Sequence, residues 1–225
     1  MIFNYSHWFD NKINLFLTQS DQYWDKGYPI SRKEKITQYF NFKDKKIVIP
    51  EQIHSDIIAN VSSQSDNLVC DSIIYSSTSN IVGVINVADC VPVCIYDCVN
   101  NYIALVHSGW KGTHKKITVK TIERLEAMGS RKSNLKVFLG PSIKGCCYQV
   151  EDYFASQFDR CSIINKEDSF FVDLSLQIKF DLESTGIPTN NINISKICTY
   201  DNDNCHSFRR DAKQSGRMSF IAFKN

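Results

Sequence analysis

Long apolar runs, a strong net charge and a Gly- or Pro-rich linker are all missing from this sequence of 225 residues. The apolar runs are much shorter than the roughly 20 residues that a helix needs to cross a bilayer, so we expect no membrane partner. A formal net charge of +2 provides no basic field, which argues against nucleic acid as the main partner. Since neither a linker nor an internal repeat divides the chain, residues 1–225 are predicted to form one domain.

The N-terminus has no basic region followed by an apolar stretch, so we expect no export signal. The nine cysteines are many, and their number is odd. A full disulfide framework is therefore not expected, and the sequence predicts reduced thiols in the cytoplasm. Most of the thiols are expected to be small apolar core residues, Cys94 and Cys98 among them, because Pro92 and its β-branched neighbours indicate a strand.

Strand patterns are the commonest feature that the sequence does contain. Continuous apolar and β-branched runs predict strands at 68–75, 81–87, 91–97, 102–107, 135–140 and 217–223. The short, asparagine-containing turn after residue 97 predicts that two of these strands pair as a hairpin.

Two helices are predicted between the strands. One covers 113–129, with Thr113 as its cap and Gly129 at its end. The other covers 173–186, where apolar side chains recur every four residues. Strands and helices intermingle, so the predicted fold class is α/β (α+β): a single domain with mixed β-sheets in a layered sandwich and helices outside.

Residues with functional chemistry gather at the ends of the predicted strands, where sites are commonly built. His54, Cys90 and His107 together form a His₂Cys set that suits Zn²⁺, and three protein ligands leave a fourth position open for catalysis. The spacing is long and irregular. A hydrogen-bonded structural histidine and a core cysteine explain each residue equally well when it is taken alone.

Other cysteines and arginines leave alternatives open. Cys198 and Cys205 flank an Asp/Asn loop and form either a metal knuckle without the usual C-x-x-C spacing or ordinary loop thiols. The vicinal thiols in "GCC" are not expected to form a bridge, because the ring would be strained. Arg209 and Arg210 belong either to a solvated charged turn or to a phosphate site with paired donors.

Five segments together resemble the laccase-domain family, also called multi-copper polyphenol oxidase or YfiH-like proteins. In family order they are "QIHS" (52–55), "ADCVP" (88–92), "HSGWKG" (107–112), "GPSIKGCCYQV" (140–150), and "CT" (198–199) followed by "SFRRD" (207–211) and "GRM" (216–218). The family's N-terminal Gly-Gly-Val-Ser and Ser-Leu-Asn-Leu elements have no clear copy between residues 9 and 35. Lys111 replaces the family's usual arginine, which keeps the charge and loses the planar fork.

The resemblance implies an enzyme of purine nucleosides. It implies one zinc ion held by His54, Cys90 and His107, phosphorolysis of adenosine, inosine, guanosine and methylthioadenosine, and adenosine deamination. Small-molecule nucleoside and phosphate are the expected partners, with a monomer or small homo-oligomer as the assembly.

The resemblance also suggests roles for single residues. Cys90, His107 and Asp89 are the expected catalytic residues, with Asp89 either orienting a histidine or carrying a proton. Substrate and phosphate are expected to contact Arg209, Arg210 and Lys111. Trp110 and Tyr148 are candidates for stacking on a purine, although an aromatic residue is more often part of the core.

Three other functions compete. A copper-dependent polyphenol oxidase is the less favoured alternative, because the sequence has only five histidines and no H-x-H pair. A peptidoglycan-editing hydrolase would use Cys90 as nucleophile and His107 as base. A non-catalytic module with a structural zinc is disfavoured, because structural sites normally have four protein ligands.

Overall fold

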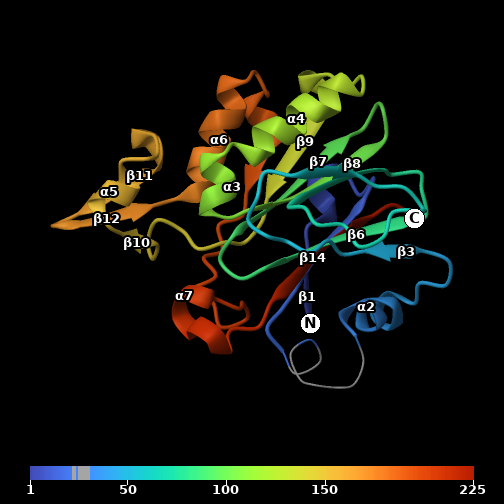
Figure 1. Ribbon diagram of the computed structural model, residues 1–225, viewed down its shortest axis with the longest axis horizontal. Helices are drawn as coiled ribbons and strands as arrows, with labels where there is room; N and C mark the ends of the chain where they lie inside the picture. The colour runs from blue at the N-terminus through green and yellow to red at the C-terminus, as the bar shows by residue number, and fades with distance from the viewer. Residues whose placement is uncertain (22–23, 25–30) are drawn as a thin grey trace.

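Two β-sheets packed face to face form the centre of the computed structural model, which describes residues 1–21, 24 and 31–225 (Figure 1). The first sheet has the order β1 (Ile2–Asn4), β2 (Asn14–Thr18), β14 (Met218–Phe223), β6 (Ile81–Val87) and β3 (Lys46–Val48). The second has the order β13 (Ile192–Ile194), β9 (Leu135–Leu139), β7 (Val91–Asp97), β8 (Tyr102–Ser108), β5 (Ser72–Ser76) and β4 (Ile58–Asn60).

The alternation of side chains along β7 explains why this strand is apolar throughout. Cys94 and Tyr96 point into the core between the two sheets, while Val93 and Ile95 belong to the core under the outer helices. Successive strand residues face opposite sides, so a strand covered on both faces needs apolar residues at every position.

Helices cover the outer faces of both sheets. Helices α4 (Ile117–Ala127) and α6 (Leu174–Ser184) pack on the second sheet, and α2 (Arg32–Phe40) packs through Ile36 on the first. The short helices are α3 (Trp110–His114), α5 (Asp152–Ala155) and α7 (Phe208–Asp211), with 3₁₀ turns η1 (Ser6–Phe9), η2 (Lys132–Asn134), η3 (Arg160–Ser162), η4 (Thr189–Asn191) and η5 (Ala212–Gln214). The resulting layers are helix, sheet, sheet and helix, which confirms the predicted mixed α+β sandwich.

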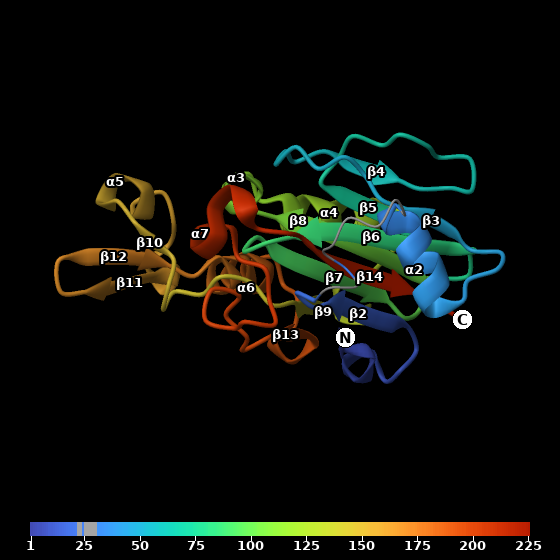
Figure 2. The same ribbon diagram turned by 90° about the horizontal axis from the view of Figure 1, so that it is seen from below.

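A small third sheet projects from one side of this body (Figure 2). It has the order β10 (Gln149–Val150), β12 (Ser169–Val172) and β11 (Ile163–Lys166), and α5 lies against it. Within residues 1–21, 24 and 31–225, each helix is too short or too polar to span a membrane.

The predicted hairpin and the helix over 173–186 are confirmed. β7 and β8 pair antiparallel, with Val93 opposite Val106. Asp173 caps α6 by accepting from the Ser175 and Leu176 amides, and Gly186 follows the helix with φ +96°. A left-handed glycine after a helix is a common terminator.

Two predictions about local structure were wrong. The helix predicted over 113–129 is two helices, because Lys116 has a left-handed φ of +58° and interrupts the helical backbone between α3 and α4. Thr113 lies inside α3 and is not its cap, although Gly129 does follow α4. Cys98 is exposed and not part of the core, because the Asp97 side chain accepts backbone N–H bonds and ends β7 in a turn.

The link between β6 and β7 carries the chain from one sheet to the other. It consists of Ala88, Asp89 and Cys90, and Asp89 adopts a φ of +80°. A sharp turn is needed here because the two strands it joins belong to different sheets. Cys90 therefore emerges at the edge where the two sheets meet.

Candidate functional site

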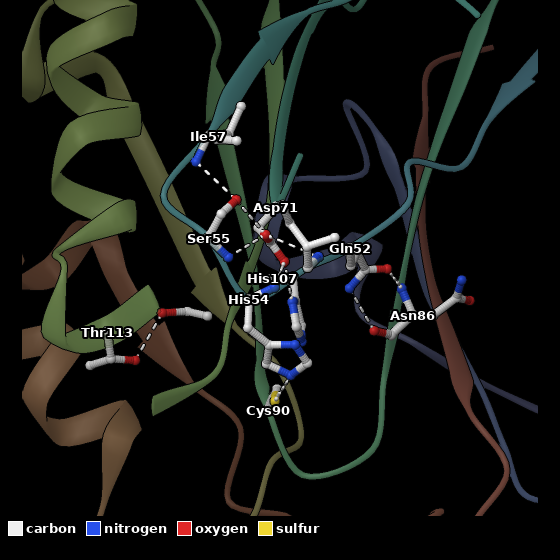
Figure 3. A network of polar contacts seen from close by, with 11 residues as sticks. Gln52, His54, Ser55, Ile57, Asp71, Asn86, Cys90, His107 and Thr113 are labelled. Atoms are coloured by element: carbon white, nitrogen blue, oxygen red, sulfur yellow. Dashed lines mark hydrogen bonds and ion pairs between the residues drawn. The ribbon is translucent and has the colours of Figure 1, made fainter. Parts of the chain in front are cut away.

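Three side chains with metal-ligating atoms converge at this edge (Figure 3). His54 comes from the turn after β3, Cys90 from the β6–β7 link, and His107 from the end of β8. Their ligand atoms lie within 4.8 Å of one another, and the His54 Nε2 is 3.9 Å from the Cys90 Sγ. The two imidazole rings stand nearly perpendicular, with centroids 4.8 Å apart. The structure thus brings together the three residues that the sequence singled out.

Asp71 holds two of these segments in place. Its carboxylate is fully buried and accepts the backbone N–H groups of His54 at 3.0 Å and Ser55 at 2.6 Å, as well as the Ser55 hydroxyl at 2.7 Å. It also bonds the His107 Nδ1 at 2.8 Å, as Figure 3 shows. Burial alone would raise the pKa of Asp71, but the hydrogen bonds from His107 and Ser55 outweigh it and lower that pKa to about 2. An ionised Asp71 must accept, so the His107 Nδ1 carries the proton and Nε2 faces the site.

Gln52 fastens the same turn to β6. Its side-chain amide accepts the Asn86 N–H at 2.7 Å and donates to the Asn86 carbonyl at 2.9 Å. These two hydrogen bonds hold the turn that carries His54 against β6, the strand that leads into the Cys90 link. His54 itself has φ +58°, a conformation that the Asp71 bond to its N–H stabilises.

Cys90 and His107 form a charged pair. Burial raises the pKa of Cys90, but hydrogen bonds and charge from His107 and His54 lower it to about 6. Burial lowers the pKa of His107, but its bonds to Asp71 and Cys90 raise it to about 9. At neutral pH the stable form is therefore a thiolate beside an imidazolium, and the thiolate is the form that binds metals and attacks electrophiles.

The donor set fits a zinc ion. One thiolate and two imidazoles are ligands that Zn²⁺ accepts, and Asp71 provides the carboxylate behind the histidine that such sites usually have. Gly109 allows this close arrangement, since a Cβ there would lie 2.8 Å from the Cys90 Sγ and 3.1 Å from the His54 Cδ2. The glycine of the "HSGWKG" segment thus leaves room for the ligands themselves.

Asp89 supports the site in a way that its sequence position does not reveal. Its carboxylate accepts the Thr199 hydroxyl at 2.6 Å and the Arg209 N–H at 2.7 Å. Among the described residues, the carboxylate that bonds to the His107 ring is that of Asp71. Asp89 lines the cavity and ties the β6–β7 link to the C-terminal loops.

A cavity of about 630 Å³ opens beside the three ligand residues. Arg209 and Arg217 bring positive charge to its wall, and Trp110, Tyr148 and Phe208 bring aromatic surface. The Arg209 guanidinium lies 5.0 Å from the centre of the Tyr148 ring and donates to the Gln149 carbonyl at 2.8 Å. This volume falls in the usual range for small-molecule sites.

Arg210 and Lys111 lie outside the described lining of this cavity. The Arg210 guanidinium binds both carboxylate oxygens of Asp211 at 2.9 Å and the carbonyls of Thr199, Tyr200 and Cys205. The Lys111 ammonium lies 5.5 Å from the Trp110 ring centre. Of the three cations predicted to contact substrate, the structure brings Arg209 to the cavity.

Sequence reasoning missed two residues of the site. Asp71 lies within a predicted strand, and the feature that could have revealed it is an acidic residue among the apolar neighbours of "LVCDSIIY". An acid placed in a buried run needs partners, so it often marks a site. Arg217 belongs to the "GRM" segment and to the predicted last strand, and neither feature predicts that it lines the cavity.

Comparisons with known proteins show the family of the chain. Residues 14–224 match the family described as multi-copper polyphenol oxidoreductase laccase. The chain belongs to this family. A family member from Clostridium acetobutylicum named purine nucleoside phosphorylase is 35% identical over 230 residues, covering 96% of this chain and 94% of its own. Another protein of that name, from Borreliella burgdorferi, is 34% identical over 195 residues, covering 84% and 85%.

Solved structures share the fold of the family. YlmD from Geobacillus stearothermophilus superposes with a TM-score of 0.85 at 20% identity, covering 95% of this chain and 92% of its own. The Bacillus licheniformis protein YfiH gives a TM-score of 0.83 at 22% identity, covering 96% and 94%. The family description speaks of copper oxidation, whereas the two sequence relatives carry the name of a phosphorylase.

Proposed function

We propose that this protein is a zinc-dependent purine nucleoside phosphorylase, acting on adenosine, inosine, guanosine and methylthioadenosine. The observation that carries the proposal is one cavity that combines the His54, Cys90 and His107 donors with Arg209 and aromatic side chains. The names of the two sequence relatives support the same activity.

The arginines of the cavity suit a phosphate co-substrate. In phosphorolysis a phosphate oxygen forms a bond to the ribose C1′ while the bond from C1′ to the purine nitrogen breaks. The electron pair leaves with the purine, which takes up a proton. Arg209 and Arg217 would neutralise the phosphate dianion and aim its oxygen at C1′, because a guanidinium offers several N–H donors in a fixed plane. Arg210 is committed to Asp211 and to loop carbonyls, so its part would be to position the loop that carries Arg209.

The aromatic residues suit the base. Trp110 and Phe208 are 37% and 51% exposed, which leaves ring surface at the cavity for a purine to stack on. Burial raises the pKa of Tyr148, so its hydroxyl stays protonated and can donate to the substrate. When bound to His54, Cys90 and His107, zinc would act as a Lewis acid that stabilises negative charge developing on the substrate. Asp71 would keep the His107 Nε2 directed at the ion.

Adenosine deamination is proposed as a second activity of the same site. Three protein ligands leave one zinc coordination position for water or substrate, which is the arrangement of hydrolytic zinc sites. The cytoplasm remains the expected location, in keeping with the nine free cysteines.

A metal-free cysteine hydrolase that edits peptidoglycan is the competing function. The thiolate–imidazolium pair of Cys90 and His107 favours it, since this is how cysteine nucleophiles are activated. Metal dependence separates the two functions, because zinc ligation would occupy the nucleophile. A His₂Cys set also suits a single copper ion, so the metal that restores activity decides between nucleoside chemistry and the oxidase that the family description names.

The deciding experiment incubates protein reconstituted with zinc or copper with adenosine, inosine and methylthioadenosine, with and without phosphate. We expect free purine base and ribose 1-phosphate (methylthioribose 1-phosphate from methylthioadenosine) only when zinc and phosphate are both present. Cys90→Ala should lower kcat/KM by at least about 100-fold. The matched control is Cys98→Ala, which removes an exposed thiol at the opposite end of β7 and should retain full activity.

The opposite results are equally informative. Release of free base at the same rate with and without phosphate would contradict a phosphorylase. Activity on a peptidoglycan precursor after a chelator has removed the metal would favour the hydrolase. Full activity in Cys90→Ala would exclude both. Arg209→Gln should raise KM for phosphate more than KM for the nucleoside, whereas equal effects on both would remove Arg209 from the phosphate site.

A further inference from the structure

A second set of metal-type donors lies outside the described lining of the cavity. Cys146, Cys147, Cys198 and Asp201 place three thiols and a carboxylate within 4.8 Å of one another. The Cys147 Sγ lies 3.1 Å from the Cys146 Sγ and 3.3 Å from the Asp201 Oδ2. The Cys146 Sγ lies 3.7 Å from the same oxygen. We call these four residues the thiol cluster.

The backbone, and not chance contact, brings the thiol cluster together. Ser142 and Cys198 form a parallel β-bridge, and the Thr199 N–H donates to the Ser142 carbonyl at 3.1 Å. Downstream of Ser142, the Cys147 and Tyr148 N–H groups both donate to the Lys144 carbonyl at 2.9 Å. This turn directs two successive cysteines to the loop that carries Cys198 and Asp201.

The chemistry of the thiol cluster calls for a cation. Cysteine sulfurs and carboxylate oxygens are ligands of Zn²⁺, and in the thiol cluster they contact one another. The ammonium of the nearby Lys144 is engaged elsewhere, donating to the Ser142 and Ser175 hydroxyls at 3.0 and 2.7 Å.

We propose that Cys146, Cys147, Cys198 and Asp201 form a second metal site that binds a thiophilic divalent cation, zinc in preference, in a closed four-ligand shell. Tetrahedral zinc with Zn–S bonds of about 2.3 Å requires sulfur atoms about 3.8 Å apart, which separations of 4.8 Å or less reach by side-chain rotation. Four protein ligands leave no position for substrate, so the site is structural. The inference does not depend on the phosphorylase reaction.

The position of the thiol cluster indicates what a bound ion would stabilise. Thr199 follows Cys198 directly and donates its hydroxyl to Asp89, the neighbour of Cys90. Arg210 binds the carbonyls of Thr199 and Tyr200 in the same loop. A cation on Cys198 and Asp201 therefore fixes the loop that supports the wall of the active-site cavity.

Thiol alkylation of the wild-type protein tests the site without any mutation. Reduced protein is treated with iodoacetamide before and after saturation with zinc, and each cysteine is followed by peptide mass spectrometry. We expect zinc to slow alkylation of Cys146, Cys147 and Cys198 at least tenfold. Cys98 and Cys161 are exposed thiols in the same chain and should react equally in both states. Equal reactivity of the thiol cluster with and without zinc would overturn the proposal.

Metal content separates the two sites. Zinc-saturated wild-type protein should hold two ions per chain, His54→Ala one, and the double variant Cys147→Ser/Cys198→Ser one, with Cys161→Ser as the control that keeps two. Cobalt bound to His54→Ala should show the charge-transfer absorption of a three-thiolate site. One ion in the wild type, lost with His54, would refute the second site and leave the first intact. If the double variant does not fold, the alkylation of the wild type decides alone.

Discussion

The two groups of metal-type donors in this protein differ in what surrounds the sulfur. At His54, Cys90 and His107, the His107 imidazolium supplies positive charge, and the fully buried Asp71 fixes the orientation of that ring before any ion arrives. In the thiol cluster, the sulfurs contact one another and a carboxylate, and burial raises the pKa values of Cys146 and Cys147. The first group is prepared as a thiolate with an open coordination position, whereas the second needs a cation to become ionised. The comparison indicates a catalytic role for the first group and a structural role for the thiol cluster.

The pH at which each thiol ionises should show the largest contrast. In metal-free protein, alkylation of Cys90 should have its midpoint at about pH 6, against the ordinary value of 9.0, which is about a thousandfold change in the acid dissociation constant. Cys147 should have its midpoint above 9.0. The measurement is the pH dependence of iodoacetamide labelling, followed per peptide. Equal midpoints for the two thiols would remove the distinction between the groups.

Asp71→Asn should weaken only the first group. The substitution removes the charge that fixes the His107 tautomer, so zinc affinity at this site should fall by about 10- to 100-fold. Competition with a chelator measures it. The thiol cluster provides the internal control, because its zinc affinity should not change. A loss of equal size at both sites would mean that Asp71 stabilises the fold as a whole.

Acid should remove the support of the first group in a defined pH window. The folded pKa of Asp71, about 2, lies below its ordinary value of 3.8, so the unfolded chain binds the proton more tightly. The stabilisation is therefore complete above pH 4 and disappears as pH falls from 3.8 to 2, with a size of roughly 2 kcal/mol. Urea unfolding between pH 2 and 5 should show a smaller loss in Asp71→Asn than in the wild type. Parallel curves for the two proteins would contradict the assigned pKa.

Gly109→Ala should have the smallest effect and sharpen the comparison further. The new methyl group would lie 2.8 Å from the Cys90 Sγ, so we expect zinc at the first group to bind about tenfold more weakly, with the thiol cluster unaffected. Gly112→Ala is the matched control on the same helix. Its methyl group would lie 3.2 Å from the Ile117 Cγ2 and would meet His107 only at the backbone carbonyl, at an ordinary contact distance of 3.5 Å. Equal metal affinities in the two variants would show that the sulfur has room to move.

Much of the fold followed from local patterns. The continuous apolar runs of β6 and β7 predicted strands covered on both faces, and the pairing of β7 with β8 followed from a short turn. The prediction of a single helix over 113–129 was wrong because nothing in the side-chain pattern indicates that Lys116 adopts a left-handed conformation. The prediction of Cys98 as a core residue was wrong because the end of β7 depends on hydrogen bonds that the Asp97 side chain accepts two and three residues further on.

The sequence by itself predicted His54, Cys90 and His107 as metal donors, since they lie in short segments whose residue types suit metal chemistry, and the structure brings these three residues together. Only the tertiary structure decided which side chains hold these donors in place. Asp71 reaches His54 and His107, Cys198 meets Cys146, and Arg209 lines the cavity while Arg210 binds Asp211. Residue identity fixes what an atom can do. Which atoms meet depends on how two sheets pack, and that packing joins positions far apart in the chain.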